Sequence, residues 1–351
     1  MIYENSSDQM ISSDTFDFIV IKDPHFMFGF KNRIRKSKWE IDIDDKIDQI
    51  INYCLENNIN KIIFTGDIFE KSRKKDWSLS QGLQNKKRLR KFNDAGIEVF
   101  SILGNHDYFD GHETIKETFF EDCVESGLIT YIGAGNKKVF DIALGKNIIF
   151  YGIDYSEDKS KIINQLKSIE MDFIPDKKTF KVVTLHSNIT SDIERLTDFT
   201  YGELSQYNVD LFNCGHYHIQ SQLGSIFETS GTIFCNPWNL TRVARDYAAK
   251  MDEHIPEFCV FSISEAPEDS SDDFQVLSKT IPLKVKPFSE AFNIDVINLL
   301  QEIGKTEFKF FEEVTLDEDL VEVDDLSTLE KFMHQHNISN EALQIAKEYL
   351  E

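Results

Sequence analysis

The sequence predicts an α/β fold, a β-sandwich flanked by helices, and three observations support this prediction. Apolar stretches of strand length alternate with amphipathic stretches of helix length from residue 17 to about residue 245, which is the pattern of an α/β protein. Several predicted strands end at a conspicuous polar residue, so these polar groups share one edge of the fold. A chain of 351 residues can bury such a core and still carry a smaller second unit.

The first part of the chain predicts strands and helices in alternation. Residues 18–23 form a predicted strand, and residues 43–57 carry apolar side chains at helical spacing, which predicts a helix that faces the core. Residues 61–67 predict the next strand and residues 78–95 the next helix. Residues 98–107 predict another strand, which ends in the polar segment GNHD.

The middle of the chain contains four further predicted strands. They span residues 138–144, 147–155, 179–187 and 209–218. Gly145 lies between the first two of them, so we expect these two strands to form a hairpin.

The sequence predicts four segments that differ in composition and in expected structure. Residues 1–14 contain acids and no apolar core, so we expect a disordered leader rather than a secretory signal. Residues 15–245 form the main domain, and residues 246–325 are expected to form a small α+β cap-like region with acidic loops. Residues 326–351 predict a C-terminal hairpin of two short helices. No stretch approaches the roughly 18 apolar residues of a membrane span, so we expect no membrane contact.

The cysteines argue against both disulfides and a thiolate zinc site. They are five in number, scattered and never spaced as CxxC. We expect buried thiols and, with the leader lacking a signal, a cytoplasmic protein. The five are Cys54, Cys123, Cys214, Cys235 and Cys259.

The net charge of −23 is the main objection to a nucleic-acid substrate, because phosphate binding normally requires a basic surface. The charge is uneven, however. Basic runs lie within residues 31–38, 71–75 and 86–91, whereas the acids crowd residues 265–325. Screening over roughly 8–10 Å would let basic loops bind phosphate despite a distant acidic segment. Each basic run can equally well be an ordinary solvated face.

Five short motifs follow predicted strands and supply oxygen and nitrogen ligands for metal ions. The motifs are DPH, GD, GNHD, a single histidine and GHYH. Imidazole, carboxylate and amide groups without a thiolate suit manganese, iron or zinc, and a carboxylate can bridge two ions. The sequence therefore predicts a two-metal site. Its candidate ligands are Asp23, His25, Asp67, Asn105, His186, His216 and His218.

The spacing of these residues has a simple geometric interpretation. On an extended segment, the side chains at i and i+2, such as Asp23 and His25, lie on one face. Gly66, Gly104 and Gly215 precede ligand candidates, and a glycine there allows tight turns and close backbone approach.

The set DxH, GD, GNHD, H and GHxH resembles the calcineurin-like metallophosphoesterase superfamily over roughly residues 17–245. Residues 66–70, GDIFE, resemble the GDxFD segment of SbcD-type DNA nucleases and lack the arginine of GDxVDRG protein phosphatases. Residues 104–107, GNHD, agree, since those phosphatases usually show GNHE. Residues 236–241, NPWNLT, resemble the PWxLT segment of phage recombination nuclease subunits, with Cys235 in place of the usual glycine.

The resemblance implies a ligand set for each of two divalent ions, Mn²⁺ or alternatively Mg²⁺. One ion would be bound by Asp23, His25, Asp67 and His218. The other would be bound by Asp67, Asn105, His186 and His216, so that Asp67 bridges the pair. His106 is not needed as a ligand, and its position beside Asn105 lets it face the scissile phosphate as the catalytic residue. Arg242, Arg245 and His112 are further candidates for substrate contacts.

The resemblance also implies an activity and partners. We expect a metal-dependent DNA exonuclease or endonuclease that acts with an SbcC-type ABC ATPase, bound through residues 326–351, in DNA end processing, recombination or repair. We further expect a homodimer, in the cytoplasm or, if the chain is phage-encoded, in the host cytoplasm. Alternatively, the C-terminal hairpin packs on its own domain. An alternative function, which the acidity favours, is a phosphomonoesterase or small-molecule phosphodiesterase of the same superfamily.

Overall fold

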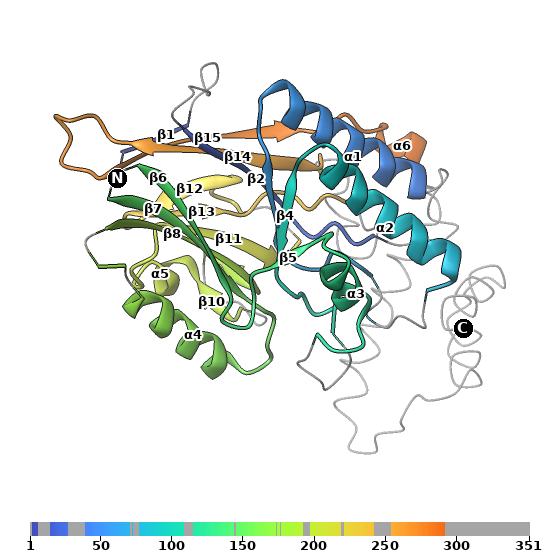
Figure 1. Ribbon diagram of the computed structural model, residues 1–351, viewed down its shortest axis with the longest axis horizontal. Helices are drawn as coiled ribbons and strands as arrows, with labels where there is room; N and C mark the ends of the chain where they lie inside the picture. Colours follow the sequence, from blue (N-terminus) through green and yellow to red (C-terminus); the bar gives the residue numbers. More distant parts are fainter. Residues whose placement is uncertain are drawn as a thin grey trace, which may run out of the picture. The chain divides into compact units, whose positions relative to one another are not determined.

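The structure is a computed structural model (Figure 1). Contacts between residues divide the chain into two compact units. Unit 1 comprises residues 1–31 and 37–288, and unit 2 comprises residues 32–36 and 289–351. The residues that the structure describes are 2–5, 15–26, 39–70, 72, 77–108, 115–143, 145–172, 174–175, 177–191, 197–218, 221–241 and 254–291. The short helix α6 (Phe288–Ala291) lies at the boundary of the two units.

One layer of unit 1 is a seven-stranded mixed sheet. Its central strands are parallel to one another, whereas the strands on one side of them come from the C-terminal part of the unit and from the N-terminus. The order is β1 (Ile2–Asn5), β15 (Phe274–Pro282), β14 (Glu257–Glu265), β2 (Phe16–Ile21), β3 (Lys61–Phe64), β4 (Glu98–Ser101) and β5 (Thr130–Tyr131).

The second layer is a six-stranded sheet that contains the predicted hairpin through Gly145, since β6 and β7 pair antiparallel. Strands β7, β8, β11 and β13 are parallel to one another, whereas β12 pairs antiparallel with β13. The order is β12 (Ile226–Thr229), β13 (Thr232–Cys235), β11 (Leu211–His216), β8 (Lys178–Ser187), β7 (Lys146–Ile153) and β6 (Lys137–Ala143). Strands β9 (Ile189–Thr190) and β10 (Phe199–Thr200) form a separate pair.

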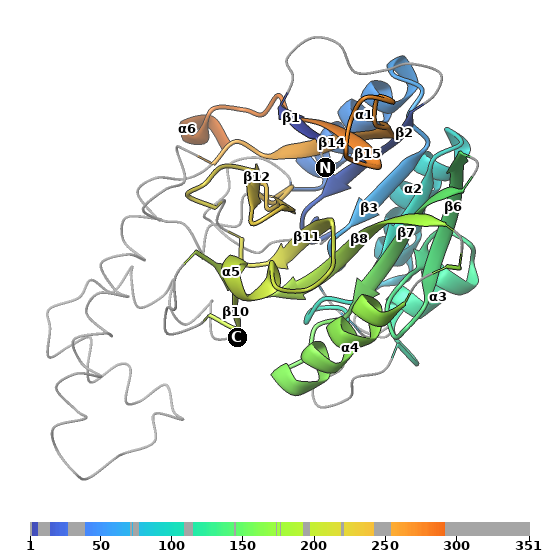
Figure 2. The same ribbon diagram turned by 90° about the vertical axis from the view of Figure 1, so that its left-hand side faces the viewer.

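Helices cover the outer face of each sheet, so the predicted sandwich flanked by helices is confirmed (Figures 1 and 2). Helices α1 (Trp39–Glu56), α2 (Leu79–Asp94) and α3 (Phe119–Glu125) pack on the seven-stranded sheet. Helices α4 (Lys159–Met171) and α5 (Tyr201–Leu204) pack on the six-stranded sheet. No helix among the described residues is long and apolar enough to cross a membrane.

Aromatic side chains fill the space between the two sheets. Phe150 on β7 is fully buried, and its ring lies 5.1 Å from that of Phe18 on β2 and 5.4 Å from that of Phe100 on β4. Rings at these separations interact edge to face and exclude water from the sandwich. This apolar layer fixes the two sheets face to face, and so it fixes which strand ends meet at the edge.

The C-terminal part of unit 1 differs from the predicted domain boundary near residue 245. Strand β14 pairs antiparallel with β2, with Phe261 opposite Phe18, and β15 continues the sheet beyond β14. Residues 257–282 therefore belong to the main fold and not to a separate cap-like region. The physical reason is that β2 would otherwise be an open, apolar edge strand.

The N-terminus also differs from its prediction, because residues 2–5 of the expected leader form β1 and pair parallel with β15. The described residues do not include residues 6–14, residues 246–253 and 292–325 of the predicted cap-like region, or the predicted hairpin at residues 326–351.

Helix α2 begins at a capping box and carries the third basic run of the sequence. The Ser78 hydroxyl accepts from the Gln81 backbone amide, and the Gln81 side chain accepts from the Ser78 amide. Farther along, three of its basic side chains form ion pairs within the unit. They are Lys86 with Asp122 at 2.6 Å, Arg88 with Asp44 at 2.7 Å and Lys91 with Asp48 at 2.6 Å. Much of this run is therefore neutralised by acids of α1 and α3.

We predict that Phe150→Ala lowers the free energy of unfolding by about 3–5 kcal/mol, because it leaves a cavity between the sheets. Val139→Ala is the matched control, since Val139 lies on the adjacent strand β6 and is 39% exposed, and it should change stability by less than about 0.5 kcal/mol. Urea unfolding of both variants measures the difference. Equal losses would mean that the layer between the sheets does not hold the sandwich together.

Candidate metal centre

The structure brings all seven predicted ligands together at one edge of the sandwich. Each follows or ends a strand of the seven-stranded sheet, β2, β3 or β4, or of the six-stranded sheet, β8 or β11. Because neighbouring parallel strands end at the same edge, the loops that follow them meet there. Register also contributes, since Gly215 on β11 lies opposite His186 on β8.

The first cluster consists of His25, Asp67 and His218. The Nε2 atoms of His25 and His218 lie 2.9 Å apart, and the Nε2 of His25 lies 3.7 Å from Oδ2 of Asp67. Asp23 is close by, with its Oδ2 3.8 Å from the Nε2 of His218. These atoms are the donors that the resemblance assigns to one ion.

The second cluster consists of Asp67, His186 and His216. The Nε2 of His186 lies 3.2 Å from Oδ2 of Asp67. The amide oxygen of Asn105 lies 3.2 Å from the same nitrogen and 2.8 Å from the Nδ1 of His216. Asp67 therefore belongs to both clusters, as a bridging carboxylate would.

The backbone at the clusters corrects the expected geometry of the DPH motif. Strand β2 ends at Ile21, and Asp23 and His25 have φ angles of 37° and 43°, so the segment is not extended. Asp67 and His216 also have positive φ angles, of 46° and 81°. Left-handed conformations cost energy for residues with a Cβ, and they concentrate at functional sites. The paired side chains converge because the turns are strained, not because a strand alternates.

Hydrogen bonds with neighbouring backbone groups and with the Thr65 hydroxyl orient these side chains. The Asp23 carboxylate accepts from the Thr65 hydroxyl and from the His216 amide, both at 2.8 Å. The Nδ1 of His186 lies 2.8 Å from the Thr65 carbonyl oxygen, to which it must donate. That bond leaves the Nε2 of His186 without a proton in the neutral ring, facing Asp67 as a metal-binding nitrogen would.

Two of the predicted glycines are required by close approach. A Cβ at Gly104 would overlap the Asp67 carboxylate, and a Cβ at Gly215 would overlap the Thr65 carbonyl oxygen. Neither position can accept a larger side chain unless the central carboxylate or β3 moves. The glycines let the buried strand ends pack directly against the polar cluster.

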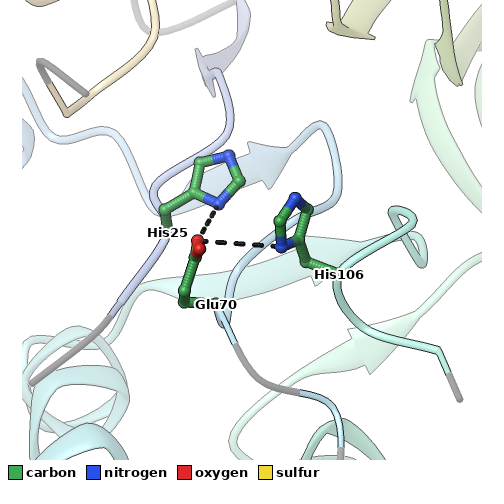
Figure 3. A group of neighbouring side chains, drawn as sticks. All are labelled: His25, Glu70 and His106. Atoms are coloured by element: carbon green, nitrogen blue, oxygen red, sulfur yellow. Dashed lines mark hydrogen bonds and ion pairs between the residues drawn. The ribbon is translucent and has the colours of Figure 1, made fainter. Parts of the chain in front are cut away.

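Sequence reasoning did not identify Glu70 as a site residue, although it stands in the quoted segment GDIFE. Figure 3 shows its carboxylate between two histidine rings. One oxygen, Oε2, lies 2.9 Å from the Nδ1 of His25 and 3.7 Å from the Nδ1 of His106. The position of Glu70, three residues after Asp67, was the feature of the sequence that could have identified it as a site residue. Glu70 thus positions the imidazole of His25 from behind, and the same oxygen lies beside the ring of His106.

Asp107 and Tyr155 were also missed. Asp107 is fully buried and accepts from the Gly104 amide at 3.0 Å and the Phe69 amide at 3.2 Å, which ties the loops after β3 and β4 together. Burial, followed by the charge of Asp67, raises its pKa to about 7. The ring of Tyr155 lies 5.1 Å from that of His216 and forms part of the wall beside the second cluster.

The electrostatics of the centre are those of a cation site. Burial opposes the charged form of His25, but the hydrogen bond and charge of Glu70 outweigh it and raise its pKa to about 10. Burial is likewise outweighed at His186, where the charge of Asp67 raises the pKa to about 9. Burial and the charge of His186 lower the pKa of His216 to about 4. Carboxylates and imidazoles thus converge with protons between them, and a divalent cation fits the place of those protons.

Three predicted substrate contacts, His112, Arg242 and Arg245, lie outside the described residues. His106 is described and lies at the edge of the centre, with its side chain 36% exposed. Its backbone amide donates to Oδ1 of Asp67 at 2.9 Å. The ring is therefore fixed beside the clusters but remains accessible to a substrate.

Comparisons with known proteins find one matching family and one relative of low identity. The family model described as calcineurin-like phosphoesterase matches residues 16–220. The Bacillus subtilis (strain 168) protein named uncharacterized metallophosphoesterase YhaO is 24% identical over 182 residues, which are 51% of this chain and 41% of that protein. The chain therefore spans less than half the length of this relative.

Two solved structures are similar at low identity. A dimetal phosphatase from Danio rerio matches with a TM-score of 0.41 and 10% identity, over 71% of this chain and 94% of that one. A 5'-nucleotidase from Candida albicans SC5314 matches with a TM-score of 0.42 and 13% identity, over 80% of this chain and 54% of that one.

We predict that the metal-free protein becomes less stable as the pH rises from about 6.5 toward about 9 to 10. The folded-state pKa values of His25 and His186 are raised, so their contribution is complete below pH about 6.5 and is lost through the folded pKa values. Urea unfolding with a chelator measures the slope.

Glu70→Gln is the matched variant, because it removes the carboxylate that raises the pKa of His25. Its stability should fall less steeply over the same pH range. Identical slopes for the two proteins would show that Glu70 does not control the protonation of His25.

Proposed function

The chain belongs to the calcineurin-like phosphoesterase family, whose members are metal-dependent phosphoesterases, and we propose that its substrate is the phosphodiester backbone of DNA. The observation that carries the catalytic part is the buried Asp67 carboxylate, shared by two clusters of nitrogen and oxygen donors. Such sharing suits two adjacent ions, which clamp the phosphate of an in-line displacement.

Each ion has a proposed set of ligands. Asp23, His25, Asp67 and His218 would hold one ion, and Asp67, Asn105, His186 and His216 the other. The donor set contains four imidazoles, two carboxylates and an amide, with no thiolate, and this set favours Mn²⁺, with Mg²⁺ as the alternative. When bound, the two ions would lower the pKa of a water molecule and neutralise charge on the phosphoryl oxygens.

His106 is the proposed catalytic residue of the chain itself. The backbone amide of His106 donates a hydrogen bond to Asp67, and Nδ1 of its ring lies close to the Glu70 carboxylate. These two contacts hold the ring beside the clusters. Because Nδ1 lies on the side of Glu70, Nε2 would be the ring nitrogen that meets the substrate phosphate. With a proton on each ring nitrogen, the ring would stabilise phosphate charge or give the Nε2 proton to the leaving oxygen, which typically contributes about 10²–10⁴-fold.

The choice of DNA rests on two segments. GDIFE, with Glu70 between the two histidine rings, resembles the corresponding segment of SbcD-type nucleases. NPWNLT lies directly behind the centre, since the Leu240 amide donates to the Lys22 carbonyl oxygen at 2.8 Å. Both segments are therefore part of the catalytic neighbourhood, where differences between subfamilies would affect the substrate.

A phosphomonoesterase or small-molecule phosphodiesterase is the second candidate, and a specific observation favours it. The net charge is −23, and in the third basic run Lys86, Arg88 and Lys91 are paired within the unit. Residues 31–38 and most of 71–75 lie outside the described residues. DNA binding would therefore depend on those first two basic runs and on Lys87 and Arg90, the exposed members of the third.

The partners are proposed on the same resemblance. Residues 326–351, outside the described residues, would bind an SbcC-type ABC ATPase, and the complex would process DNA ends in recombination or repair in the cytoplasm. A homodimer through α2 is supported by Leu79 and Leu83, which are 81% and 60% exposed and lie one helical turn apart. An exposed apolar pair at this spacing is suited to helix packing.

We predict that the purified chain degrades end-labelled linear DNA with Mn²⁺, and that Asp67→Asn and His106→Ser each reduce this activity strongly for different reasons. Asp67→Asn should lose bound metal, whereas His106→Ser should retain it and lose about 10²–10⁴-fold in rate. Metal content and cleavage are measured on the same samples.

A chromogenic phosphomonoester and a chromogenic phosphodiester are assayed in parallel. Hydrolysis of either without cleavage of DNA, even when an SbcC-type ATPase and ATP are present, would reject the nuclease proposal and leave the second candidate.

We predict that Leu83→Glu converts a dimer into a monomer, because it places a charge in the apolar contact of α2. Leu55→Glu is the control, since Leu55 is 55% exposed near the end of α1 and is not part of the Leu79 and Leu83 pair. Sedimentation velocity distinguishes the states. A wild-type monomer at all concentrations would rule out the homodimer.

A further inference from the structure

Lys22 is a fully buried lysine immediately before Asp23, and the roles assigned so far do not use it. Taking an ammonium group out of water is costly unless good acceptors surround it. Burial lowers the pKa of Lys22, and the charges of Asp23 and Glu257 offset that effect only in part. The side-chain nitrogen of Lys22 donates its hydrogen bonds to groups other than these two carboxylates. Charge pairing alone therefore does not explain why a lysine is buried here.

The ammonium group of Lys22 binds two acceptors that come from two different segments. One is the backbone carbonyl oxygen of Tyr217, at 2.5 Å, and the other is the side-chain oxygen of Asn236. Tyr217 stands between His216 and His218 in the GHYH motif. Lys22 therefore holds the peptide unit that joins a histidine of each cluster.

The second acceptor connects this contact to NPWNLT. Asn236 is buried, its amide group donates to the Tyr201 hydroxyl at 2.7 Å, and its backbone amide donates to the Ser225 carbonyl oxygen at 2.8 Å. The side-chain oxygen of Asn236 thus points at Lys22 from a fixed position. The backbone carbonyl oxygen of Lys22 also accepts a hydrogen bond from the Leu240 amide.

We propose that Lys22 is a positioning residue that holds the Tyr217 carbonyl against the Asn236 side chain and thereby sets the places of His216 and His218. The proposal rests on the proposed two-metal function. His218 belongs to the first cluster and His216 to the second, so one hydrogen-bonded lysine controls a ligand of each ion. It also gives NPWNLT a role, as the fixed support of that lysine.

The strained turn explains why such support is needed. His216 has a φ angle of 81°, a conformation that persists only where surrounding contacts enforce it. The bond to Tyr217, one residue farther on, is such a contact. Partners behind metal ligands commonly change metal affinity about 10- to 100-fold when they are removed.

Lys22→Met tests the proposal against Lys46→Met. Lys46 is also buried, and its ammonium group donates to the Leu240 carbonyl oxygen at 2.9 Å and pairs with Asp42 at 3.1 Å. Both variants remove a buried lysine that donates a hydrogen bond to the NPWNLT segment. Lys22 also donates a hydrogen bond to the Tyr217 carbonyl oxygen, and this is the contact that the comparison tests. Both should lower the melting temperature. Lys22→Met alone should weaken Mn²⁺ binding by about 10- to 100-fold.

The full chain is titrated with Mn²⁺ alone and followed by calorimetry and by electron paramagnetic resonance. Two Mn²⁺ ions about 3.5–4 Å apart couple magnetically, and Lys22→Met should weaken or abolish the coupled signal while Lys46→Met keeps it. If Lys22→Met binds two ions with wild-type affinity and coupling, Lys22 is only structural and the proposal is wrong. If Lys22→Met does not fold, Lys22→Gln, which keeps a polar head group, replaces it in the same titration. Weaker binding or a weaker coupled signal would then support the proposal, and wild-type binding and coupling would contradict it.

These measurements separate this proposal from the nuclease proposal, because they do not depend on a substrate. A wild-type chain that binds two coupled ions but does not cut DNA would reject the substrate and leave the role of Lys22 open to the same comparison. A wild-type chain that binds no pair of ions would reject both.

Discussion

The Asp67 carboxylate is the group on which the rest of the centre depends. It is buried, it accepts the His106 amide with one oxygen, and its other oxygen faces His25 and His186. Burial raises its pKa, but the charge and hydrogen bond of His186 outweigh that effect and hold the pKa well below the ordinary value. A buried carboxylate that stays ionised requires cationic partners, and the whole strand edge is arranged to supply them.

Several costly features follow from this requirement. Asp67 itself has a positive φ angle, Gly104 must lack a side chain to admit its carboxylate, and Asp107 ties the flanking loops at the expense of a raised pKa. Such strain persists only on a rigid support. The aromatic layer around Phe150 and the two paired sheets are that support, because they fix five strand ends before the loops begin.

Charges elsewhere in unit 1 are used in a different way. On α1 and α2, Asp44 and Arg88 form a pair in which the guanidinium is buried, and it also lies 5.6 Å from the ring of Phe26, next to His25. The helical layer is thus connected electrostatically to the loop that carries the DPH motif. The same pairing removes basic charge from the surface, which explains why a basic run in the sequence need not be a phosphate-binding face.

The sequence by itself determined the alternation of strands and helices, the sandwich and the identity of the residues that meet at its edge, because periodicity and strand-end motifs are local properties. Tertiary structure decided the rest. The pairing of β14 with β2 joins residues more than 200 positions apart, and no local pattern specifies it. The approach of Glu70 to His25 and of Lys22 to Tyr217 likewise depends on how separate turns pack. These contacts arise between segments, so only the folded chain determines them.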